Sequence, residues 1–263
     1  MPLTDTIGAN WAWVIPALSA SAFFLVFPFR RVLPQQGAFI SIAAILLGFV
    51  LFWFILGDLL NGENKEFSVN WLKAGNAQLT WGMLLDPLSV MMIGLVTFIA
   101  LGIQVYSWGY MAHEPRFGWY FAIHALFAAV MVTLVLADNF LLLYIAWELV
   151  GLCSYLLIGF FYERRSAAEA AKKAFVTTRI GDVGLLIGIL LLFKETGTFE
   201  MSTIFEMVKQ GALSDGVITV SSILIFLGAM GKSAQFPLHV FTSRGSYVAP
   251  TPLRRGAADT LHS

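Results

Sequence analysis

The sequence has little charge and almost no cysteine. Lysine, arginine, aspartate and glutamate make up 12% of its 263 residues, whereas a soluble domain carries about 25%. The single cysteine, Cys153, excludes an intrachain disulfide and a cysteine-rich metal centre. The formal net charge is zero, which argues against a polyanionic partner such as a nucleic acid.

The chain also lacks the sequence marks of a soluble catalytic domain. Its longest polar loops, 61–86 and 194–216, contain neither a phosphate-binding glycine loop nor a metal cluster. Residues 231–233, Gly-Lys-Ser, look like the end of a Walker A loop, but Phe226 stands where that loop requires glycine. The first ten residues carry Asp5 and no basic side chain, so we expect no cleaved signal peptide.

Long apolar runs are what the sequence does contain. Hydrophobic residues make up 58% of the chain. They come in blocks of roughly 18–25 residues, long enough to cross about 30 Å of hydrocarbon as helices. We therefore predict an all-α fold, a polytopic transmembrane helix bundle. The seven predicted spans are 11–29, 39–60, 87–110, 119–136, 140–161, 174–193 and 217–240.

The loop before the last span is predicted to hold a short amphipathic segment. Its apolar residues fall on one helical face: Phe199, Ile204, Phe205 and Val208.

Lysine and arginine predict the orientation. With the N-terminus outside, ten basic residues fall on the inner side and four on the outer side, the asymmetry that the positive-inside rule favours. The inner residues are Arg30, Arg31, Arg116, Arg164, Arg165, Lys172, Lys173, Arg244, Arg254 and Arg255, and the outer ones are Lys65, Lys73, Lys194 and Lys209. An odd number of spans then places the C-terminus inside.

Four ionisable residues stand out within the predicted spans: Glu148, Arg179, Asp182 and Lys232. A charge in hydrocarbon costs at least about 2.5–3.5 kcal/mol, so such a residue is by default a functional hypothesis. At about 1.5 Å per residue, the two acids and Lys232 fall in the middle half of the membrane. Placed on three consecutive spans, they can form a neutralising cluster.

Two pairings follow from these positions. Arg179 and Asp182 are three residues apart and share a helix face, which predicts an internal salt bridge that lets the sixth span insert. Glu148 and Lys232 lie on different spans, where a pair is either structural or carries protons. We favour the second interpretation, because burial shifts carboxyl and ammonium groups towards their neutral forms.

The last span contains residues that weaken a helix around Lys232. Gly228 and Gly231 loosen the helix and allow close helix approach. Pro237 has no N–H, so the carbonyl four residues earlier loses its helical partner. A freed carbonyl at membrane depth is tolerated where it is buried in protein or lines a wet cavity. We therefore predict that the seventh helix is broken and has a polar centre.

Two histidines have alternative interpretations. His239 either holds water near the predicted break or is an interfacial residue. His124, in the fourth span, is interpreted as a lone packed or interfacial histidine.

Four ordered stretches resemble the antiporter-like subunits of respiratory complex I, in particular the NADH-quinone oxidoreductase subunit L (mitochondrial chain 5) family. They are DPLSVMM at 86–92, LVLADNFLLLYIAWELVGLCSYLLIGF at 134–160, KKAFVTTRIGDVGLL at 172–186 and GAMGKSAQFPLHV at 228–240. The sister subunits and Mrp-type sodium/proton antiporter subunits share the glutamate and the lysine. The WELVGLCSYLLIGF and TRIGD strings look more like subunit L.

The resemblance implies a fold of two inverted five-helix repeats, each with a broken helix, joined by a hydrophilic axis. It implies that Glu148 and Lys232 form the proton-handling pair of the first repeat and that Asp182 supports the network. With Arg179 and His239, these residues make up the predicted proton-translocation set.

The resemblance also implies a role. The chain is expected to be a non-redox, proton-translocating subunit of NADH:quinone oxidoreductase, with no catalytic centre or cofactor of its own. NADH and quinone bind other subunits, and quinone reduction there is coupled to H⁺ transport here. The expected partners are other membrane subunits of complex I, especially a neighbouring antiporter-like subunit, and the lipid bilayer. The expected location is the bacterial plasma membrane rather than the mitochondrial inner membrane.

The C-terminal part departs from the family. Beyond 240 only the Pro-Thr-Pro at 250–252 agrees with it, and the eighth helix and second repeat are missing. We expect a truncated or frame-shifted product, or one piece of a split gene. The predicted domains are 1–85, a two-span segment with an outer loop; 86–241, the third span and the incomplete first repeat; and 242–263, a polar tail.

Three alternatives stay open. One is an inactive fragment or a scaffold for neighbouring subunits, and another is an Mrp-type cation/proton antiporter subunit. A retinal-type protein is suggested by Lys232 in a seventh span, but its third span should carry an acidic counterion, and only Asp86 lies at the edge of that span.

Overall fold

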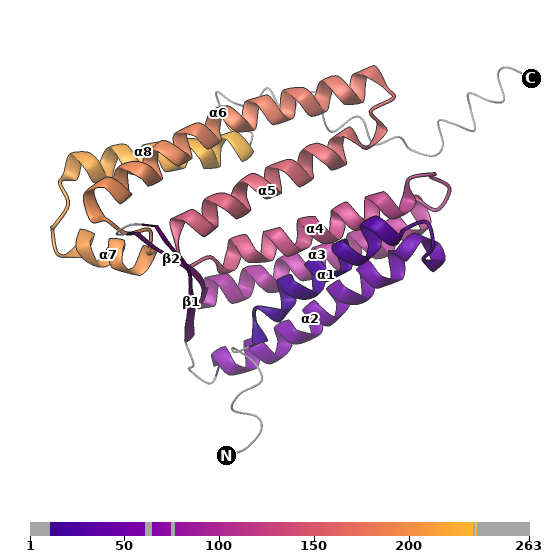
Figure 1. Ribbon diagram of the computed structural model, residues 1–263, viewed down its shortest axis with the longest axis horizontal. Helices are drawn as coiled ribbons and strands as arrows, with labels where there is room; N and C mark the ends of the chain where they lie inside the picture. Colours follow the sequence, from indigo (N-terminus) through magenta and orange to yellow (C-terminus); the bar gives the residue numbers. More distant parts are fainter. Residues whose placement is uncertain (1–10, 61–64, 75–76, 234, 236–263) are drawn as a thin grey trace, which may run out of the picture.

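The structure is a computed structural model that describes residues 11–60, 65–74, 77–233 and 235 of the chain. Helices make up most of these residues (Figure 1). The helices are α1 (Val14–Phe29), α2 (Ala38–Leu60), α3 (Pro87–Tyr110), α4 (Phe117–Leu136), α5 (Phe140–Ile158), α6 (Arg165–Thr196), α7 (Met201–Lys209) and α8 (Asp215–Lys232). The other elements are strands β1 (Lys65–Ala74) and β2 (Ala77–Leu85) and the short 3-10 helices η3 (Pro34–Gly37) and η4 (Gly159–Phe161).

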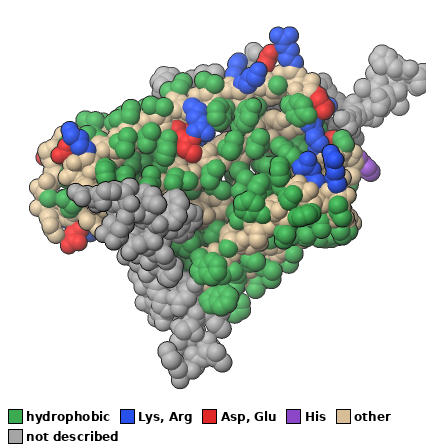
Figure 2. Space-filling model, in the orientation of Figure 1, with side chains coloured by type: hydrophobic (Ala, Val, Ile, Leu, Met, Phe, Trp, Pro, Cys, Tyr) green, Lys and Arg blue, Asp and Glu red, His purple; other side chains and the backbone are tan. Residues whose placement is uncertain are grey.

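Six helices of the described residues are long and apolar enough to cross a membrane, namely α2 to α6 and α8. They confirm six of the seven predicted spans. The seventh, α1, has 16 residues, and at 1.5 Å per residue it is about 24 Å long. Hydrophobic side chains cover most of the face seen in Figure 2, while charged ones gather mainly towards its ends. This is the pattern expected of a multi-pass membrane protein.

One helix boundary differs from the predictions. The sixth span was predicted from 174, but α6 begins at Arg165, because alanine and lysine favour helix and Arg165 pairs with Glu169 one turn on at 3.0 Å. The last span was predicted to run to 240 with a break around Lys232; α8 ends at Lys232, and residues 236–240 lie outside the described residues. Hydropathy measures how apolar a segment is and does not detect where its helical hydrogen bonding stops.

The helices form a bundle whose sequence neighbours lie side by side (Figure 1). Helices α1 to α4 pack together, α5 covers α4, α6 lies beside α5, and α8 packs mainly on α6. Local capping fixes two starts. Asp86 and Ser89 form a reciprocal capping box on α3, and the Asn139 side chain accepts the Leu142 N–H at the start of α5, at 2.7 Å.

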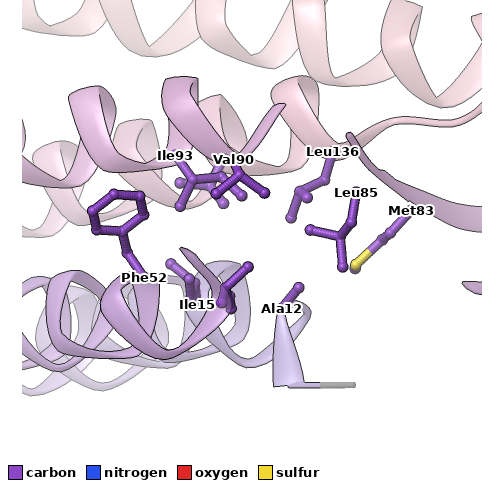
Figure 3. Close-up of a cluster of buried hydrophobic side chains, with 10 residues drawn as sticks. Ala12, Ile15, Phe52, Met83, Leu85, Val90, Ile93 and Leu136 are labelled. Carbon is purple, nitrogen blue, oxygen red and sulfur yellow. The ribbon is translucent and has the colours of Figure 1, made fainter. Parts of the chain in front are cut away.

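The loop 61–86 contains an antiparallel hairpin that was not predicted. Strand β1 pairs with β2 from Lys65 opposite Leu85 to Ala74 opposite Ala77. The end of β2 enters the bundle, where Met83 and Leu85 are buried in a cluster with residues of α1, α2, α3 and α4 (Figure 3). The hairpin therefore ties the first four helices together at one end of the bundle.

The amphipathic segment predicted in the sixth loop is confirmed as α7. Ile204 is buried and packs in one cluster with Phe140 of α5 and Phe199. Phe205 is more than half exposed, so the apolar face is narrower than predicted. Together, α7 and the hairpin cap the end of the bundle at which α5 begins (Figure 1).

Candidate functional site

The four charged residues of the spans meet between α5, α6 and α8. Helix α5 carries Glu148, α6 carries Arg179 and Asp182, and α8 carries Lys232 at its last position. The sequence hypothesis of a cluster on three consecutive spans therefore agrees with where these residues lie. The partners within the cluster differ from those predicted.

Arg179 forms an ion pair with Glu148 across the α5–α6 interface. The side chains are 35% and 17% exposed, so water screens the pair incompletely. The Arg179 guanidinium also lies over the Phe175 ring, 4.5 Å from its centroid. The predicted salt bridge between Arg179 and Asp182 is not formed, because the arginine reaches the carboxylate of the neighbouring helix instead.

Trp147 links the other two charged residues. Its indole N–H donates a 2.6 Å hydrogen bond to the Asp182 carboxylate. Its backbone carbonyl accepts a hydrogen bond from the Lys232 ammonium, which also lies 4.3 Å from the centroid of the indole ring. The predicted direct pair between Glu148 and Lys232 is therefore absent, since each has another partner.

Asp182 is the most buried charged residue of the cluster, with 1% of its surface exposed. One carboxylate oxygen accepts the Trp147 N–H, and the other has no hydrogen-bond partner among the described residues. Asp182 and Lys232 lie near enough to interact electrostatically. An oxygen that is buried without a donor leaves a place for a proton or a water molecule.

Glycines bring α6 and α8 together beside this cluster. A side-chain carbon added at Gly181 would lie 3.0 Å from the Leu227 carbonyl oxygen, and one at Gly188 would lie 2.9 Å from the Ser221 carbonyl oxygen. These contacts are with backbone, which cannot move aside easily. The close approach lets Lys232 reach past α6 to α5.

Gly228 and Gly231 make the matching contacts from α8. An added carbon at Gly228 would lie 2.8 Å from the Leu185 side chain, and one at Gly231 would lie 3.3 Å from the Gly181 Cα. Close helix approach is thus confirmed, while a role of these glycines in breaking the helix stays a prediction. Helix α8 is continuous through both and ends one residue later, at Lys232.

Replacing Gly188 with alanine should lower the free energy of unfolding by about 1–3 kcal/mol, the usual cost of overpacking. The matched control is Gly102→Ala on α3, where nothing lies within 4 Å of an added carbon. There we expect a stabilisation of up to about 1 kcal/mol from the better helix propensity. Unfolding titrations in detergent measure both variants, and equal effects would contradict the packing argument.

Two predicted site residues, Pro237 and His239, lie outside the described residues. The last described part of this region is Ser233 and Gln235, whose backbone N–H groups bond to the carbonyls of Ala229 and Met230 at 2.9 and 3.2 Å.

Two family models match the chain. One, described as NADH:quinone oxidoreductase/Mrp antiporter, TM, matches residues 137–254. The other, described as NADH-Ubiquinone oxidoreductase (complex I), chain 5 N-terminus, matches residues 71–121. NADH-quinone oxidoreductase subunit L of Mycobacterium tuberculosis is 40% identical over 257 residues, which cover 95% of this chain and 40% of that protein. The chain belongs to the NADH:quinone oxidoreductase/Mrp antiporter family.

Two further relatives agree with this assignment. NAD(P)H-quinone oxidoreductase chain 5 of Synechocystis sp. is 41% identical over 254 residues, which cover 92% of this chain and 37% of that protein. The solved Mrp complex from Dietzia sp. contains a chain of the same fold, with a TM-score of 0.77 and 26% identity, covering 89% of this chain and 25% of that one. The chain thus spans about two fifths of the length of the curated relatives it matches.

Sequence reasoning missed one residue of the charged cluster, Trp147. A signal was present, because an indole N–H in the middle of a membrane span needs an acceptor. Trp147 also directly precedes Glu148, so the two side chains leave α5 about 100° apart. That geometry lets adjacent residues face Asp182 and Arg179 of the same neighbouring helix.

A second polar cluster lies between α2, α3 and α4. The buried Gln104 amide nitrogen donates to the Ser41 hydroxyl at 2.7 Å and lies 3.2 Å from Nδ1 of His124. Ser41 in turn donates to the Phe121 carbonyl at 3.1 Å. His124 is therefore packed, as one of the interpretations has it, but it is not alone, because Gln104 contacts its ring. Hydrogen bonds of this kind hold membrane helices together by about 0.6–2 kcal/mol each.

We also searched the described part of the chain for side chains that could bind a metal ion. Within it, no group of three or more His, Cys, Asp or Glu side chains is arranged to bind a metal ion.

Proposed function

We propose that this chain forms part of a proton-translocating membrane subunit of an NADH:quinone oxidoreductase-type complex. The observation that carries the proposal is the polar cluster among α5, α6 and α8, in which Arg179 pairs with Glu148 and Trp147 bonds to both Asp182 and Lys232. Membership of the antiporter family supports it, as do the relatives that are named as subunits of such complexes. Electron transfer is assigned to other subunits.

The arrangement suggests a relay driven by charge. Protonation of Glu148 would neutralise the carboxylate that holds Arg179. Arg179 lies near enough to Lys232 to repel it, and once its guanidinium is freed from Glu148 this repulsion would favour loss of the lysine's proton. Lys232 can lose that proton without stranding a partner, because its hydrogen-bond acceptor is the neutral carbonyl of Trp147. The Asp182 carboxylate, which interacts with both Arg179 and Lys232, would stabilise the positive charge of Arg179 until Lys232 takes up another proton.

We also propose how the chain is divided into segments, how it is oriented in the membrane and which subunits it contacts. We assign residues 1–85 to an N-terminal segment, 86–241 to the first antiporter-like repeat with its preceding span, and 242–263 to a polar tail. The distribution of basic residues favours an N-terminus outside a bacterial plasma membrane. The proposed partners are other membrane subunits, in particular a second antiporter-like subunit, with NADH and quinone bound elsewhere in the complex.

The test uses proteoliposomes that contain the complex whose subunit carries this sequence. Glu148→Gln and Lys232→Ala should each lower the initial rate of proton uptake at least about tenfold, because each removes a group that gains and loses a proton. The matched control is Lys194→Gln, since Lys194 lies in the last turn of α6 with its side chain 78% exposed. Unchanged uptake in both site variants, with normal assembly, would refute the proposal.

A further inference from the structure

A basic pocket of about 520 Å³ lies where α1 meets η3 and the start of α4. Its lining includes Arg30, Arg31, Arg116, Gln35, Gln36 and Trp119. Figure 2 shows arginine and lysine side chains grouped at one end of the hydrophobic face. An arginine-rich pocket beside apolar helices suits an anionic group at the membrane surface.

The charge in this pocket is mostly uncompensated. Arg116 is 3.4 Å from the exposed Glu163 carboxylate and lies over the Tyr162 ring. Arg30 donates to the Phe27 carbonyl at 3.3 Å. Neither Arg30 nor Arg31 forms an ion pair with a described carboxylate. Guanidinium groups that lack a carboxylate are free to bind phosphate oxygens, two at a time.

The backbone of η3 holds the rim of the pocket in an unusual conformation. Gln35 and Gln36 have positive φ values of 47° and 52°, which cost non-glycine residues energy and often occur at ligand sites. Their side-chain oxygens accept hydrogen bonds from the Trp108 indole at 2.9 Å and the Gly118 N–H at 2.7 Å. The strained turn is therefore fixed to α3 and α4, which keeps the pocket open.

An apolar groove of about 500 Å³ runs between α1, α4 and α5. Ala17, Ala20 and Phe24 line it from α1, and Leu126 and Ala129 are among its lining residues on α4. Apart from Thr133, all its lining residues are apolar. The small side chains on α1 leave room for an apolar ligand, which neither donates nor accepts hydrogen bonds.

The groove and the basic pocket share one lining helix, α4, and the arginines of the pocket follow directly after the end of α1. On α4, Trp119 of the pocket and Leu126 of the groove are seven residues apart, which is two helical turns or about 10 Å. On the α1 side, Phe24 of the groove lies in the last turns of α1, and Arg31 of the pocket lies in the turn that follows the helix. The charged pocket and the apolar groove are thus separate cavities that lie about two helical turns apart along α4.

We propose that the pocket and groove together bind one anionic phospholipid. The phosphate lies among Arg30, Arg31 and Arg116, and an acyl chain fills the groove between α1 and α5. Charge complementarity selects an anionic headgroup over a zwitterionic one. The lipid would fix α5 against α1, and α5 carries Trp147 and Glu148. This proposal rests on the two cavities and does not depend on proton translocation.

Native mass spectrometry of the purified chain in detergent tests the headgroup site. With equal amounts of dioleoyl-phosphatidylglycerol and dioleoyl-phosphatidylcholine, the chain should retain the anionic lipid preferentially. Arg30→Gln/Arg31→Gln should weaken that retention about tenfold or more. The control Arg164→Gln/Arg165→Gln removes two basic residues that do not line the pocket. Equal retention of both lipids, or equal loss in both variants, would overturn the proposal.

A second arm tests the groove and separates a lipid from a free anion. Ala20→Phe narrows the groove and should reduce phosphatidylglycerol retention several-fold, whereas Ser21→Phe, at an exposed position that does not line it, should not. Added inorganic phosphate at millimolar concentration should compete poorly, because it has no chain to bury. Full competition by phosphate, or no effect of Ala20→Phe, would show that the groove takes no part.

Discussion

Replacing Arg179 with alanine is expected to lower the free energy of unfolding by about 3–5 kcal/mol. The change leaves the Glu148 carboxylate, 17% exposed, without the cation that faces it. A buried charge without a partner costs far more than the pair contributes, because its desolvation is no longer offset. Unfolding in mixed micelles, titrated with SDS and followed by tryptophan fluorescence, measures the change.

The matched control lies on the same helix. Arg165 pairs with Glu169 at 3.0 Å, but the two side chains are 94% and 61% exposed, so Arg165→Ala should cost less than about 0.5 kcal/mol. The double variant Glu148→Gln/Arg179→Ala should recover most of the lost stability, since it leaves no uncompensated charge. Equal costs for Arg165→Ala and Arg179→Ala would show that the buried pair is as well solvated as the surface one.

The positions of the helices are predictable because hydropathy alone determines which segments enter a membrane. The same argument identifies the residues of the charged cluster, since Glu148, Arg179, Asp182 and Lys232 stand out against apolar runs. Their partners are not predictable in this way. Arg179 can reach Asp182 on its own helix or Glu148 on the next, and the choice depends on how α5 and α6 are rotated about their axes.

The other differences between the predicted and the observed structure concern the hairpin and the glycines of α8. The hairpin carries a signal in its sequence: two alternating runs, each with β-branched or aromatic residues, are separated by Gly75-Asn76. A search for membrane spans passes over it. The glycines of α8 are ambiguous for a different reason, because glycine both weakens a helix and permits close packing. Only the position of α6 shows that Gly228 and Gly231 serve packing.

Trp147→Phe is expected to destabilise the fold by about 2–3 kcal/mol. The phenyl ring keeps most of the packing but removes the N–H that donates to Asp182 at 2.6 Å. Asp182 is 1% exposed and its second oxygen already lacks a partner among the described residues, so the carboxylate would be buried without any neutral donor. The backbone carbonyl that holds Lys232 is unchanged, so the variant isolates the role of the indole.

The rescue variant distinguishes loss of a donor from loss of a ring. Asp182→Asn in the Trp147→Phe background removes the buried charge and should restore at least half of the lost stability, whereas it should not help if packing alone is at fault. Trp108→Phe is the matched control, because Trp108 donates its N–H to the exposed Gln35 side chain at 2.9 Å and water can replace that bond. Its cost should stay within about 1 kcal/mol. If Asp182→Asn alone is stable but lowers proton uptake, then Asp182 carries charge for the relay as well as accepting the indole bond, and its electrostatic interaction with Lys232 accounts for that requirement.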